Sequence, residues 1–233
     1  MYKRQVLGEG GNQIVQMDYK QAELRAVAWL AQDEYLREVF TAGRDIHSEV
    51  AANLFGPKFT KEDRVKAKGV VFGLTYGMTS IGLSAMFRME QREAQRYIDG
   101  WFEMIPSTVE WIKSVHEQAL TEQELQSPFG HKRRFPLITR MNKEEILKKA
   151  TAFLPQNIAS NLCLLGANNI HDNGYGDRIR LLVHDAVILE LPKESKHLGL
   201  IKDLMEIAGR SIFGTYIDTP VDVAIGRSWG ELH

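Results

Sequence analysis

The chain has 233 residues, of which 44% are hydrophobic and 25% charged, as in an ordinary globular protein. Its 29 lysines and arginines nearly balance its 30 aspartates and glutamates, so any binding of nucleic acid must come from local basic patches. The single cysteine, Cys163, excludes an internal disulfide and a thiolate zinc site. We find no signal peptide and no membrane span of about 18 apolar residues, so we expect a cytoplasmic protein.

The first half of the chain reads as one strand followed by helices. Residues 12–19 are rich in strand formers and end near Asp18, so they predict a strand. Apolar residues at helical spacing predict a helix over 21–32 and helices over most of 45–118, with breaks at 56–57 and 105–106. Within this region, residues 60–63 resemble a capping signal ahead of a long helix that reaches about residue 76.

The second half mixes helices with short strands. Residues 127–136 predict a loop or short hairpin with clustered positive charge, and 143–173 and 195–213 predict helices. Two apolar runs within 180–192 flank His184 and Asp185 and predict a hairpin, and 220–226 alternates as a last strand. Strands at both ends with helices between them indicate an α+β fold with a helical insertion.

Two aspartates stand at strand ends. Asp18 closes an apolar strand, and Asp185 lies at a hairpin tip. If the strands are neighbours, both carboxylates project from one edge of the sheet, where Mg²⁺ can relieve their repulsion. Two such ions about 4 Å apart can activate an attacking hydroxyl and stabilise a leaving oxygen. From the spacing alone, two ordinary strand ends remain the alternative.

Four side chains recur every four residues within the helix expected to reach residue 76. Because each step of four turns about 40° around the axis, the four span about 120° and share one face. Two cations would grip a triphosphate, and two aromatic rings would offer a flat surface for a base. By geometry alone, a helix with a solvated basic end and a core-facing aromatic end remains the favoured alternative. The four residues are Arg64, Lys68, Phe72 and Tyr76.

Glycines accompany this helix, and a basic cluster follows later in the chain. Gly69, Gly73 and Gly77 weaken the helix and leave a bare strip beside the four side chains, which the close approach of a ligand would explain. The cluster of His131, Lys132, Arg133 and Arg134 lies in the expected loop. Such a cluster is usually solvated; in a nucleic-acid enzyme it would contact phosphates.

Three segments resemble the polymerase motifs of family A DNA polymerases. Residues 18–25, DYKQAELR, resemble the first motif, usually DYSQIELR. Residues 64–77 carry Arg, Lys, Phe and Tyr-Gly at the spacing of the second motif, and 182–186, LVHDA, is similar to the third, usually ending VHDE. Further counterparts follow in the same order at 43–49, 129–136, 155–156 and 226–229.

The resemblance implies a right-hand polymerase with an antiparallel palm sheet and a helical fingers insertion. The palm would comprise residues 1–30 and 141–233, and the fingers 31–140. The implied reaction is template-directed DNA synthesis, in which a primer 3′-hydroxyl attacks the α-phosphorus of a deoxynucleoside triphosphate (dNTP) and pyrophosphate leaves. The cofactors would be two Mg²⁺ ions, bound by Asp18 and Asp185, and Lys68 would be catalytic together with these aspartates.

The resemblance also assigns the substrate contacts. Glu23 would block the ribose 2′ position, Phe72 would pack on the nucleotide sugar, and Tyr76 would guard the templating position. The residues expected to bind the dNTP are Arg64, Lys68, Phe72, Tyr76, His47, Glu23 and Gln21. The residues expected to contact the primer–template DNA are His184, Gln156, Arg25, Lys132, Arg133 and Arg134.

The sequence departs from the family pattern at four positions. Ala186 replaces the Glu of the third motif, Lys20 and Ala22 replace Ser and Ile of the first, and Asn157 follows Gln156 in place of Gly. We expect activity to survive the change at residue 186, with an altered metal preference.

No thumb or exonuclease domain is recognised in the sequence. We therefore expect a second polypeptide that carries the thumb and the remaining palm, with an exonuclease as a further part of it. A catalytically weak or inactive subunit that binds primer–template is the alternative, supported by Ala186. Glu23 disfavours an RNA polymerase.

Overall fold

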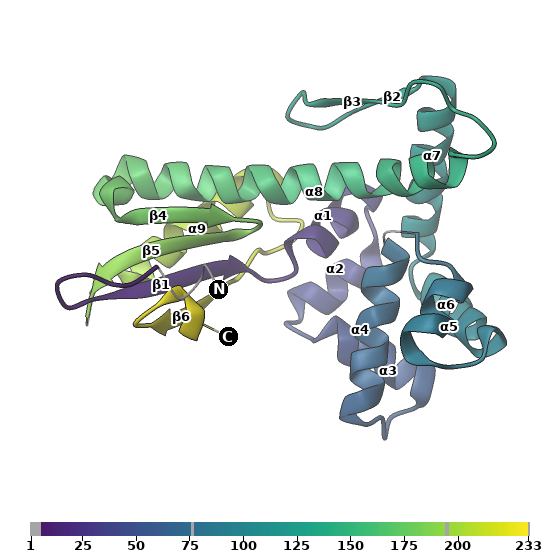
Figure 1. The fold of residues 1–233 in the computed structure, drawn as a ribbon, viewed down its shortest axis with the longest axis horizontal. Helices are drawn as coiled ribbons and strands as arrows, with labels where there is room; N and C mark the ends of the chain where they lie inside the picture. Colours follow the sequence, from purple (N-terminus) through teal and green to yellow (C-terminus); the bar gives the residue numbers. More distant parts are fainter. Residues whose placement is uncertain (1–5, 76, 194–195, 233) are drawn as a thin grey trace. The chain divides into compact units, whose positions relative to one another are not determined.

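The computed structural model describes residues 6–75, 77–193 and 196–232, and it divides the chain into two compact units. The sheet unit comprises Met1–Glu23 and Ile158–His233, and the helical unit comprises Leu24–Asn157 (Figure 1). The chain thus leaves the sheet unit after its first strand and returns to it within a helix, as a helical insertion requires.

The sheet unit is built on a four-stranded antiparallel sheet with the order β4-β5-β1-β6. Its strands are β1 (Asn12–Tyr19), β4 (Ile179–Val183), β5 (Ala186–Pro192) and β6 (Val221–Gly226). The predicted strands and the predicted hairpin are therefore confirmed, and the first strand lies between the hairpin and the last strand (Figure 1).

The two faces of this sheet bury different side chains. On one face, the buried Tyr19 hydroxyl donates a hydrogen bond of 2.8 Å to the carbonyl of Met205 in α9 (Leu198–Phe213). On the other face, Ile14, Ala186 and Ile188 form a small core, which is closed by residues near the C-terminus. Because residues alternate along β1, Asp18 lies on the same face as Ile14, at the end of the strand.

The helical unit contains the helices α2 to α7 (Figure 1). Their bounds are α2 Glu34–Thr41, α3 Ile46–Phe55, α4 Lys61–Thr75, α5 Ser80–Phe87, α6 Gln91–Met104 and α7 Pro106–Thr121. The breaks at 56–57 and 105–106 and the helix end near residue 76 are confirmed, and a further break separates α5 from α6. Helix α1 (Ala22–Ala31) begins in the sheet unit and ends in the helical one.

Side chains at the helix starts explain where these helices begin. Asp33 and Asp45 precede α2 and α3, and each carboxylate accepts a hydrogen bond from the backbone N–H three residues on. At α4, the amide of Asp63 donates to the Thr60 hydroxyl at 3.2 Å, and the Asp63 carboxylate accepts from the amide of Thr60 at 2.9 Å. This reciprocal pair is the capping box that the sequence predicts.

The basic segment after α7 is a short hairpin of β2 (Glu124–Gln126) and β3 (Lys132–Arg134). It is followed by α8 (Lys143–Ile170), which belongs to the helical unit up to Asn157. Near the base of the hairpin, Leu125 and Phe135 join a core with Val115, Ala119 and Ile146. The basic strand is thereby anchored by buried apolar residues.

Three short turns complete the described chain: a π-helical turn η2 (His171–Tyr175) and two 3₁₀ turns, η3 (Gly176–Arg178) and η4 (Trp229–Glu231). The helix expected over 143–173 is α-helical only as far as Ile170, and the π-helical turn follows it. The helix expected from residue 195 begins at Leu198. No helix in the described ranges combines the length and apolarity that a membrane crossing requires.

Candidate active site

The two predicted aspartates lie at the same end of the sheet. Asp18 is opposite Ala186, which directly follows Asp185. The backbone amide of Tyr19 donates a hydrogen bond of 3.3 Å to the carbonyl of Asp185, so the end of β1 contacts the β4–β5 turn. His184 begins this two-residue turn with φ of 56°, the left-handed conformation that reverses the chain sharply.

Burial and mutual repulsion disturb both carboxylates. Burial first, and then the charge of Asp185, raise the pKa of Asp18 to about 6. Burial raises the pKa of Asp185 as well. Glu23, in the first turn of α1, has its pKa raised by burial and then by Asp185. Three acidic groups therefore share a poorly solvated place, where a cation would favour their ionised forms.

The donor set at this place suits magnesium. Mg²⁺ prefers carboxylate oxygen and takes few protein ligands, since it keeps water and substrate phosphates in its shell. In the part of the chain that the structure describes, no three His, Cys, Asp or Glu side chains converge as a ready-made metal cage. Asp18 and Asp185 thus fit an ion that takes its remaining ligands from water and phosphate.

A hydrogen-bond relay orients Asp18 from the core of the same face. The Trp229 indole N–H donates to Gln16 Oε1 at 3.0 Å, which fixes the amide of Gln16. Gln16 Nε2 then donates to Asp18 Oδ2 at 3.5 Å. The sequence analysis did not single out Gln16. The sequence could have indicated its role, because Gln16 stands two residues before Asp18 in the predicted strand, and residues two apart on a strand share a face.

The basic and aromatic face of α4 carries Arg64, Lys68 and Phe72, and each of the three is exposed. Arg64 Nε donates to Asp45 Oδ2 at 2.8 Å, so an ion pair restrains the first cation. The Lys68 ammonium lies 5.7 Å from the centre of the Phe72 ring. The predicted face is thus present up to Phe72, and Tyr76 lies outside the described residues.

His47 lies beneath this face and is only 4% exposed. Its ring centre is 5.7 Å from that of Phe72, and its Nδ1 is buried without a hydrogen-bond partner in the structure. Burial lowers the pKa of His47 to about 4, so the ring is neutral at pH 7. His47 therefore supports Phe72 by packing, and its predicted phosphate contact stays a prediction.

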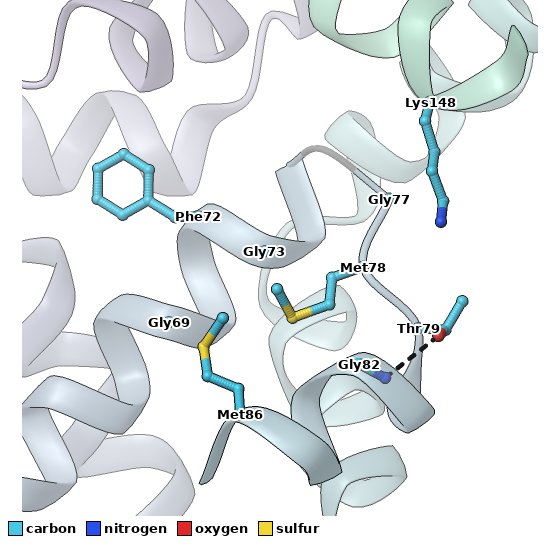
Figure 2. A pocket seen from close by; sticks show the side chains of 9 residues that line it. All are labelled: Gly69, Phe72, Gly73, Gly77, Met78, Thr79, Gly82, Met86 and Lys148. Atoms are coloured by element: carbon cyan, nitrogen blue, oxygen red, sulfur yellow. Dashed lines mark hydrogen bonds between the residues drawn. The ribbon is translucent and has the colours of Figure 1, made fainter. Parts of the chain in front are cut away.

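The glycine strip of α4 is approached by protein side chains. A Cβ on Gly69 would lie 2.3 Å from the Phe87 ring, and one on Gly73 would lie 2.7 Å from Met78 Sδ. Met78 and Gly73 both line a cavity of about 490 Å³, and Figure 2 shows the Met78 side chain beside α4 at Gly73. The sequence analysis attributed the glycines of this helix to the close approach of a ligand. At Gly69 and Gly73, the packing of Phe87 and Met78 offers a second reason for a small residue.

The residues predicted to contact DNA differ in their exposure and in their partners within the chain. In β3, Lys132 and Arg134 both pair with Glu124, at 2.7 and 2.9 Å, and Arg133 lies between them on the other face. Gln156 is exposed on α8, and Arg25 is 6% exposed and stacks 4.3 Å from the centre of the Phe40 ring.

His184 is exposed at the turn beside Asp185. Gln21, expected at the dNTP, has φ of 52° between β1 and α1. For all of these residues, contact with DNA or nucleotide stays a prediction.

Known proteins match almost the whole chain. The family model described as DNA polymerase family A matches residues 3–231. The thermostable DNA polymerase I of Thermus aquaticus is 33% identical, with 97% of this chain and 28% of that protein covered. The DNA polymerase I of Helicobacter pylori strain J99 is 32% identical over 93% of this chain and 24% of that protein.

A solved structure shares the fold. It is the POL domain of Pol1 from M. smegmatis in complex with DNA primer-template and dNTP, with a TM-score of 0.84, 26% identity, and coverage of 96% of this chain and 41% of that one. The α+β fold with an antiparallel sheet is therefore that of the palm and fingers portion of a polymerase. The chain spans about a quarter of the length of the curated relatives it matches, and it belongs to DNA polymerase family A.

Proposed function

We propose that this chain carries the catalytic centre of template-directed DNA synthesis, transferring a nucleotide from a dNTP to a primer 3′-hydroxyl. The observation that carries the proposal is the meeting of Asp18 and Asp185 at one sheet end, where both pKa values are raised. The names of the relatives and the primer-template and dNTP in the similar solved structure support it.

In this proposal Asp18 and Asp185 hold two magnesium ions. Bound there, the ions supply the positive charge that activates the primer hydroxyl and stabilises the leaving oxygen. Gln16 and Trp229 keep the Asp18 carboxylate in its orientation through their hydrogen bonds. The loss of the acidic group at Ala186 leaves these parts in place.

The exposed face of α4 binds the nucleotide. Arg64 and Lys68 hold the triphosphate and offset the charge that develops on pyrophosphate as it leaves, with Lys68 as the catalytic cation. Phe72 packs against the sugar, and Glu23 excludes a 2′-hydroxyl. Gln21, His47 and Tyr76 complete the proposed nucleotide contacts.

The primer–template lies against residues from several elements. Arg25, Lys132, Arg133 and Arg134 contact phosphates and position the duplex without reading its sequence. His184 and Gln156 contact the primer end and the minor groove, whose acceptors are similar for all correct base pairs, so they test pair shape.

We propose in addition that efficient synthesis needs thumb and further palm segments from outside residues 1–233. The length of the relatives, of which the matched region is about a quarter, supports this. Our proposal is that a second polypeptide that carries the thumb, with or without an exonuclease, can supply these segments in trans.

Primer extension with the purified chain tests the function. We expect weak extension with Mg²⁺ alone and strong extension when a polypeptide with the thumb is added. Asp185→Asn should abolish extension in both cases, and Asp177→Asn, an exposed aspartate at the other end of β4, should leave it intact. A wild-type chain that binds primer–template but extends it under neither condition would instead support the inactive-subunit reading.

A further inference from the structure

Asp18 lies between β5, where the sequence departs from a family motif, and β6, which carries an aspartate. It is opposite Ala186 on β5, where the family usually has Glu, and opposite Asp222 on β6. Directly opposed residues of antiparallel strands point to the same face, with Cβ atoms about 5 Å apart. An acidic side chain is therefore absent on one side of Asp18 and present on the other.

A further departure, at Lys20, contacts Asp222. Lys20, which stands where the first motif usually has Ser, places its Nζ 2.8 Å from Asp222 Oδ1. The two side chains are 48% and 65% exposed, so water screens the pair and gives it little weight in stability. Fold stability alone therefore does not account for a lysine and an aspartate at these two positions.

The two sides of Asp18 differ in what a third carboxylate would cost. Ala186 is 4% exposed within an apolar cluster, so a carboxylate there would lose most of its hydration. Asp222 stands on the edge strand β6 and stays hydrated. An acidic group on β6 adds negative charge beside Asp18 at little desolvation cost.

We propose that Asp222 is a positioning residue that supplies, from β6, a third negative charge beside the metal site, and that Lys20 moderates its effect. This rests on the proposed function, since it takes Asp18 and Asp185 as the magnesium ligands. Because no three such side chains converge within the described residues, Asp222 acts through charge and through hydrogen bonds to water. Lys20 holds it in place and offsets part of its attraction for a cation.

Manganese binding by the purified chain, without DNA or nucleotide, tests this by electron paramagnetic resonance of the free Mn²⁺. Removing one screened charge near a divalent cation should weaken binding about three- to tenfold, which we expect for Asp222→Asn. Asp222→Glu should retain the affinity. Lys20→Ala should strengthen binding in the wild-type background and, because each charge acts on the cation independently, by a similar factor when Asp222 is already Asn.

The controls separate this inference from the function on which it rests. Asp177→Asn removes an ion-paired surface aspartate at the far end of β4 and should bind Mn²⁺ as the wild type does. If Asp18→Asn also binds normally, the proposed metal site itself is wrong. If Asp18→Asn loses binding while Asp222→Asn matches the wild type, only the role of Asp222 is refuted. Unchanged or weaker binding in Lys20→Ala would refute the role of Lys20.

Discussion

Replacing Glu190 by Gln tests how the sheet is held at the end remote from Asp18. Glu190 is 5% exposed, and its carboxylate accepts hydrogen bonds from three groups. Oε1 accepts from the Glu9 amide at 2.8 Å and from Asn12 Nδ2 at 3.0 Å, and Oε2 accepts from Arg180 Nε at 2.8 Å. These bonds hold the pKa of Glu190 at about 2.

The lowered pKa of Glu190 gives the expected size of the stability change. A change from the ordinary value of 4.5 to about 2 corresponds to about 3 kcal/mol of stabilisation of the ionised group. The Arg180 side chain is 40% exposed, so water weakens its part. We therefore expect Glu190→Gln to lower the free energy of unfolding at pH 7 by about 1–2 kcal/mol.

The sign of the pH dependence follows from the lowered pKa. The stabilisation is complete above the unfolded pKa of 4.5 and is lost as the pH falls through about 2. Urea unfolding followed by circular dichroism should show a larger difference between wild type and variant at pH 7 than at pH 3.

A matched control is Glu145→Gln, which removes an exposed helix pair with Lys149 and should change nothing measurable. No difference between wild type and Glu190→Gln at pH 7, or the same difference at both pH values, would refute the reasoning.

Three further predictions concern packing and the nucleotide face. Gly209→Ala should destabilise the protein by about 1–3 kcal/mol in urea unfolding, because the new Cβ would lie 1.5 Å from the buried Thr219 Oγ1; unchanged stability would contradict this packing. Phe72→Tyr should increase the incorporation of dideoxynucleotides in chain-termination assays, and unchanged termination would contradict the placement of Phe72 at the sugar. Asp45→Asn should keep the α3 cap but release Arg64, changing the KM for dNTP in the wild-type background and having no effect on it in Arg64→Ala; equal changes in both would contradict the coupling.

Local features were predictable from the sequence. The strand that ends near Asp18 and the capping box of Thr60 and Asp63 depend on residues close together in the chain. The hairpin tip at His184 and Asp185 follows from two apolar runs with a polar pair between them. In each case the pattern and the structure it specifies span only a few residues.

Contacts between segments far apart in the chain could not be predicted from the sequence. The opposition of Asp18 and Asp222 depends on the register between β1 and β6, and a shift of one residue would send one of them to the other face. The Arg64–Asp45 ion pair depends on the packing of two helices, which spacing within α4 does not reveal. The packing of Met78 against Gly73 likewise depends on how the chain turns back after α4, which a predicted helix end near residue 76 does not specify.

The most direct test of the account is cation binding by the aspartate pair. Calorimetric titration of the purified chain with Mn²⁺ should be compared for wild type, Asp18→Asn, Asp185→Asn and the double variant. If the two carboxylates share the cations, each single variant should lose as much affinity as the double variant does. Wild-type affinity in either single variant would contradict the central claim, because the two aspartates would then not act at one site.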